Sequence, residues 1–84
     1  PEAIERQKIK SFLQKEKESL QEIKALLTGE QELPPEELQT KLTHMISERE
    51  YLYLHFPDGH KFQYTQSFLN RVRVEVDYFL KVIS

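Results

Sequence analysis

Apolar side chains between residues 3 and 28 recur at spacings that alternate between four and three. One position of this repeat holds Arg6, Leu13, Leu20 and Leu27, and the other holds Ile9, Glu16 and Ile23. This spacing is typical of a helix that packs along a second helix. The pattern therefore predicts a helix over residues 3–28. Gly29 ends it, because glycine readily adopts the left-handed conformation of a helix stop.

A second helix is predicted over residues 35–49. Pro35 is tolerated in a first helical turn, and the carboxylates of Glu36 and Glu37 there complement the helix dipole. The short linker between the two helices predicts an antiparallel pair.

One register of this helical pair brings opposite charges together. The register that places Leu27 on Leu38, Ile23 on Leu42 and Leu20 on Met45 also places Glu16 on Arg49. Two interpretations stay open at this point. The pair is either a buried ion pair that fixes the register or forms a polar site, or a partly exposed pair at the edge of the seam. In the second case it contributes about 1 kcal/mol or less.

The segment from residue 51 to residue 65 predicts a β-hairpin. Pro57, Asp58 and Gly59 have the order of a bulged hairpin turn, and apolar residues alternate on both sides of it. The inner face of this hairpin would consist of Leu52, Leu54, Phe56, Phe62 and Tyr64. For residues 66–83 we favour a helix, which hides the larger apolar side chains. A third strand stays open because residues 71–78 alternate.

These elements predict an α+β fold: an antiparallel helical hairpin, a β-hairpin that packs on it, and a C-terminal helix. The alternative is an all-α three-helix bundle, in which the segment after residue 50 continues the second helix. The 84 residues fit one small domain, 1–84. Because the chain begins with Pro1 rather than Met, we expect a fragment of a larger protein.

Composition narrows the classes of function. Charged residues make up 31% of the chain and the net charge is −2, which disfavours nonspecific binding to polyanions. The chain has no cysteine, so disulfides are excluded, and this favours an intracellular location. No apolar run is long enough to span a membrane, and we expect no membrane partner.

The sequence contains no recognisable set of catalytic residues. We therefore predict that the protein is not an enzyme and holds no cofactor. No serine lies in a nucleophile elbow, and the two glycines make no phosphate-binding loop. His55 and His60 flank Asp58, but the hairpin points the two histidines to opposite faces. A metal site is therefore not predicted there.

The favoured function is a protein-interaction, assembly or regulatory module that acts through the first helix and the C-terminal segment. The predicted interface consists of Ile4, Ile9, Phe12 and Leu13, because this part of the first helix outruns the shorter second helix. The expected partner is a second copy, giving a homodimer, or another protein. The alternative is nucleic-acid binding through an outer hairpin face that consists of Tyr51, Tyr53, His55, Lys61, Gln63, Arg71 and Arg73.

Overall fold

The computed structural model describes residues 2–53 and 65–84. These residues form four helices and, within the described ranges, no strand. The helices are α1 (Glu2–Thr28), α2 (Pro35–Ser47), α3 (Glu50–Tyr53) and α4 (Gln66–Ile83).

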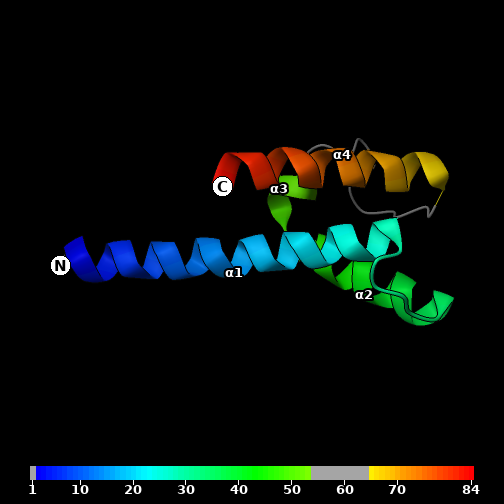
Figure 1. The fold of residues 1–84 in the computed structure, drawn as a ribbon, viewed down its shortest axis with the longest axis horizontal. Coiled ribbons are helices and arrows are strands. Elements are labelled where there is room, and N and C mark those ends of the chain that lie inside the picture. Colours follow the sequence, from blue (N-terminus) through cyan, green and yellow to red (C-terminus); the bar gives the residue numbers. More distant parts are fainter. Residues whose placement is uncertain (1, 54–64) are drawn as a thin grey trace.

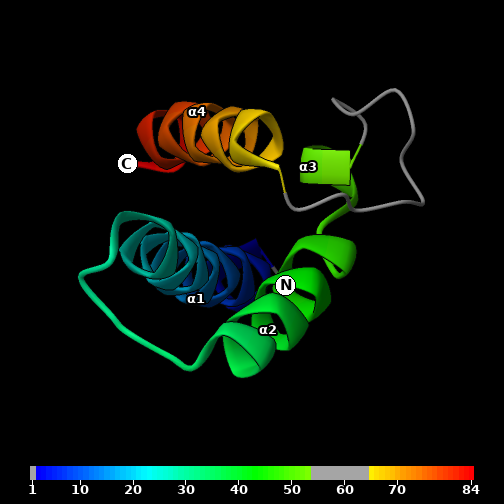
Figure 2. The same ribbon diagram turned by 90° about the vertical axis from the view of Figure 1, so that its right-hand side faces the viewer.

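Helix α1 is the long central helix against which the other helices pack (Figure 1). Helices α2 and α4 both run back along its C-terminal half, on different sides of it (Figure 2). Two ion pairs fasten them there: Lys24 Nζ lies 2.8 Å from Asp77 Oδ1 of α4, and Lys41 Nζ of α2 lies 2.5 Å from Glu22 Oε1. The N-terminal half of α1 projects beyond its neighbours.

Local sequence signals set the ends of the helices. Gly29, with φ of +84°, ends α1 in the left-handed conformation that glycine adopts without a steric penalty. Pro35 occupies the first turn of α2. The Thr65 hydroxyl accepts a hydrogen bond of 3.1 Å from the Phe68 N–H, which caps α4.

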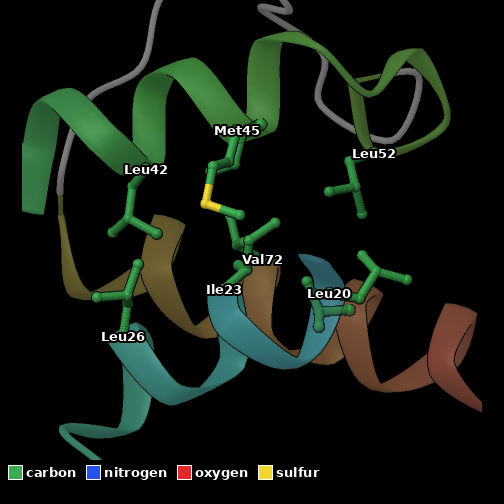
Figure 3. Packing of buried hydrophobic residues seen from close by; sticks show 9 residues of the cluster. Leu20, Ile23, Leu26, Leu42, Met45, Leu52 and Val72 are labelled. Atoms are coloured by element: carbon green, nitrogen blue, oxygen red, sulfur yellow. The ribbon is translucent and has the colours of Figure 1, made fainter. Parts of the chain in front are cut away.

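The second half of α1 and the other three helices share one apolar core (Figure 3). The core residues are Leu20, Ile23 and Leu26 of α1, Leu42, Met45 and Ile46 of α2, Leu52 of α3, and Val72 and Val76 of α4. In the close view Leu42 points toward Leu26, and Leu52 points toward Leu20. Of the predicted seam of α1, Leu20 and Ile23 are fully buried and Leu27 is partly buried, and Leu26, outside the two seam positions, also enters the core.

The predicted α+β fold is wrong, and so is the β-hairpin at its centre. Residues 50–53 form helix α3, which follows α2 after a short turn at Glu48 and Arg49. Leu52 is fully buried, as the inner face of the hairpin also required, but it reaches the core from a helix rather than from a strand. Residues 54–64, which include the predicted turn at Pro57, Asp58 and Gly59, lie outside the described residues.

The all-helical alternative matches the class that the described residues show, with α3 added to the three longer helices. The third strand considered for residues 66–83 is also wrong, because these residues form α4. The helix buries Val72 and Val76 and leaves Val74, Tyr78 and Val82 more than half exposed. The apolar residues of this segment thus follow the buried side of a helix, and the alternation of residues 71–78 does not indicate a strand.

Shortening the side chain of Leu52, the α3 residue in the core, tests this packing. We expect Leu52→Ala to lower the free energy of unfolding by about 2–5 kcal/mol, because it leaves a cavity in a closed core. The matched change Val74→Ala, at a side chain that is 57% exposed, should alter it by less than about 0.5 kcal/mol. Urea denaturation followed by circular dichroism measures both. Equal effects of the two changes would contradict the burial of Leu52.

Candidate interaction site on helix α1

A nearly buried ion pair marks the place where α1 leaves the core. Arg49, in the turn between α2 and α3, holds its Nε 3.1 Å from Glu16 Oε2 and donates from Nη2 to Oε1 at 3.2 Å. The side chains are only 10% and 15% exposed, respectively. The structure thus brings together the two residues that the helix register placed opposite each other, and it places them inside the molecule rather than at an exposed edge.

Tyr51 completes this cluster, which we call the Glu16 cluster (Glu16, Arg49 and Tyr51). The Tyr51 hydroxyl donates a hydrogen bond to Glu16 Oε2, and Arg49 Nη1 donates to the backbone carbonyl of Met45 at 2.6 Å. The Tyr51 ring meets Phe79 of α4 edge to face, with 4.7 Å between ring centroids. One carboxylate of α1 is thereby connected to all three other helices.

The environment of Tyr51 changes its acidity. Burial disfavours the charged phenolate, and the hydrogen bond to Glu16 and the charge of that carboxylate add to the effect. Together they raise the pKa of Tyr51 well above its usual value, although the nearby Arg49 cation acts in the opposite direction.

A shallow depression opens to solvent beside the Glu16 cluster. It is lined by Phe12, Glu16, Glu48, Arg49, Glu50 and Tyr51. Phe12 stands at this depression with 63% of its surface exposed, and Glu48 and Glu50 are also exposed. The depression therefore combines an accessible aromatic ring with three carboxylates around one buried guanidinium.

The depression continues into an exposed apolar surface, the α1 stripe, which we define as Ile9, Phe12 and Leu13. Their exposed fractions are 59%, 63% and 38%. Ile9 and Leu13 occupy the two repeat positions that hold Ile23 and Leu20 in the core. The stripe is therefore the same helix face, carried past the end of the packed region.

Ile4 is 55% exposed but lies apart from this stripe. It occupies a different position of the repeat, on the side of α1 away from Ile9 and Leu13. Of the four predicted interface residues, the structure therefore joins three on one face and leaves Ile4 on another.

The predicted nucleic-acid face is not assembled as expected. Tyr51 is engaged by Glu16 and Phe79 instead of lying on an exposed sheet, and Tyr53 ends α3. Arg71 and Arg73 are exposed on α4. His55, Lys61 and Gln63 lie outside the described residues.

The sequence pattern did not indicate two features of the site. It assigned Tyr51 to an exposed face, although the residue follows closely after Arg49, which already had an expected partner on the first helix. It also passed over Glu48 and Glu50, which flank Arg49 and line the depression. In the described parts of the chain, no cluster of three side chains suited to a metal occurs, and no helix is long and apolar enough to cross a membrane.

Comparison with known proteins gives one informative match. The chain is 40% identical over 78 residues to a protein of Treponema pallidum (strain Nichols) that is described only as uncharacterized. The match covers 92% of this chain but 13% of that protein, so the chain spans about an eighth of the relative's length. No family model matches the sequence, and no solved structure matches it.

A double-mutant cycle measures the Glu16–Arg49 interaction. We expect Glu16→Gln and Arg49→Met to couple by about 1–3 kcal/mol in the free energy of unfolding, because the pair is shielded from solvent. The same cycle on Glu2 and Arg6 is the control, since that pair is 3.9 Å apart and more than 80% exposed. Coupling near zero at Glu16 and Arg49 would refute a direct interaction.

The raised pKa of Tyr51 makes a prediction about alkaline pH. In the unfolded chain a tyrosine ionises near pH 10. The folded state holds its proton to higher pH, so the stability from Tyr51 is complete below about pH 10 and is lost above it. Urea denaturation from about pH 8 to about pH 11 should show a steeper loss for the unmodified chain than for Tyr51→Phe. Parallel curves would contradict the assignment, because the two chains differ only in the hydroxyl group of residue 51.

Proposed function

We propose that this chain is a noncatalytic protein-interaction module that assembles through the α1 stripe, in the first instance with itself. The observation that supports the proposal is the continuity of one helix face. That face is fully buried at Leu20 and Ile23 and lies exposed at Ile9 and Phe12. Every residue from Glu2 to Lys15 is exposed.

Phe12 offers exposed apolar area beside a group of hydrogen-bonded side chains. Burying apolar surface contributes about 25 cal/mol per Å², and aromatic side chains frequently dominate the energy of interfaces. Phe12 presents such a side chain at the edge of a depression whose floor is held by the Glu16 cluster. Little needs to be ordered when a partner covers it, which favours association.

In this proposal the Glu16 cluster holds the helices in place and takes part in no reaction. The Glu16 carboxylate accepts from Arg49 and from Tyr51, and the guanidinium also holds the Met45 carbonyl. These hydrogen bonds fix the side chains to one another. We therefore propose that the cluster fixes the angle at which α1 leaves the core.

A second apolar row lies on α4, in the C-terminal segment that the sequence analysis also selected. It consists of Val74, Tyr78 and Val82, which are 57–60% exposed. The Tyr78 ring contacts Phe79 edge to face, at 5.1 Å between ring centroids. The depression that supports Phe12 is lined by none of these three residues. We therefore place the main contact on α1 and use the α4 row for a matched control.

Sedimentation equilibrium tests the proposal. We expect the chain to dimerise at micromolar concentration and Phe12→Glu to be monomeric, because an apolar interface does not accommodate an unpaired charge. Val74→Glu introduces the same charge at a similarly exposed apolar side chain and should leave the dimer intact. Circular dichroism confirms that each variant is folded. A monomeric mass up to about 100 μM, far above a micromolar dissociation constant, would refute self-assembly. A dimer that survives Phe12→Glu would refute the α1 stripe as its contact.

A further inference from the structure

We propose that two copies pair their α1 stripes antiparallel, and that Arg6 of each copy enters the depression beside Glu16 of the other. This inference rests on the proposed function and adds the orientation, the register and a binding site for an arginine side chain. Arg6 suits this task because it is 81% exposed and its contact with Glu2 is long, at 3.9 Å.

The charges within the repeat select the orientation. Arg6 and Glu16 lie at the two ends of the α1 stripe, at seam positions otherwise filled by apolar residues. A parallel pair would set Arg6 against Arg6 and Glu16 against Glu16, which is unfavourable. An antiparallel pair that sets Ile9 against Leu13 of the second copy sets Arg6 against Glu16 of that copy. One register therefore satisfies the apolar contacts and the charges together.

The depression suits a guanidinium. Glu48 and Glu50 line it in addition to Glu16, so three carboxylates face one cation, Arg49. Glu48 is 56% exposed; its Oε1 lies 3.0 Å from His44 Nε2, and its Oε2 lies 3.9 Å from Arg49 Nη1. The planar guanidinium forms paired hydrogen bonds with carboxylates and stacks on aromatic rings, and Phe12 lies at the same depression.

The exposed half of α1 is long enough for the apolar part of this pairing, from Ile9 to Leu13. The exposed stretch from Glu2 to Lys15 is about 21 Å long at 1.5 Å per residue. The packed helices lie along the other half of α1. In an antiparallel pair they would therefore stand at opposite ends. The contact is the same surface on both copies, which closes the assembly as a dimer and exposes no further binding surface of this kind.

Exchanged charges test the site. One variant carries Arg6→Glu, and a second carries Glu48→Lys with Glu50→Lys. Each alone should dimerise at least about tenfold more weakly, because like charges then meet in both depressions. In an equimolar mixture both contacts regain opposite charges, and a heterodimer should form with an affinity near that of the unmodified chain. Lys8→Glu is the control. This substitution changes the charge by the same amount as Arg6→Glu, but Lys8 lies outside the two seam positions.

The outcomes separate this inference from the function on which it rests. Dimerisation that is lost in Phe12→Glu, with heterodimers restored in the mixture, supports the antiparallel register. Dimerisation that is lost in Phe12→Glu but unchanged in Arg6→Glu overturns the register and leaves the α1 stripe as the contact. The same conclusion follows if the two charge variants stay monomeric when mixed, with circular dichroism showing both folded. Absence of any dimer in the unmodified chain overturns the register and the proposed function together.

Discussion

The carboxylate of Glu16 is the point on which this arrangement of helices depends. Arg49 reaches it from the turn after α2, and Tyr51 reaches it from α3 while its ring contacts Phe79 of α4. A charge this far from solvent is tolerated only with partners that satisfy it, and these partners come from separate elements. The cluster therefore adds hydrogen bonds of defined direction to the apolar contacts between these helices.

The same cluster lies at a boundary in α1. Toward the C-terminus the helix face is closed by the core, and toward the N-terminus it lies open at Phe12 and Ile9. The polar group at this boundary separates the buried part of the helix face from the open part. The position of the α1 stripe thus follows from the packing of the domain and from the length of α1, which is 27 residues.

The sequence pattern predicted the long helices well and the centre of the chain poorly. The alternation of spacings along residues 3–28 is sustained over several turns, so it identifies a helix and the side that is buried. The contact of Glu16 with Arg49 could be expected because Glu16 is the one acidic residue in the seam of the first helix and Arg49 is the one basic residue in the seam of the second. Residues 50–53 are too few for a period to be measured, and aromatic residues favour strands, so α3 was missed. Its burial depends on Leu52 and Tyr51 reaching residues that are distant in the sequence, and no local pattern contains that information.

The projecting half of α1 forms as an extension of the packed half of the same helix. A separate helix of this length is marginal in water, because its first turn must be nucleated at a large entropic penalty. Here the packed half of α1 already supplies that first turn, so the exposed half forms by propagation, one hydrogen bond per added residue. The folding of the domain and the formation of the α1 stripe are thereby coupled. A chain that loses its core also loses the helix that carries the α1 stripe, so assembly of the kind proposed would require a folded chain.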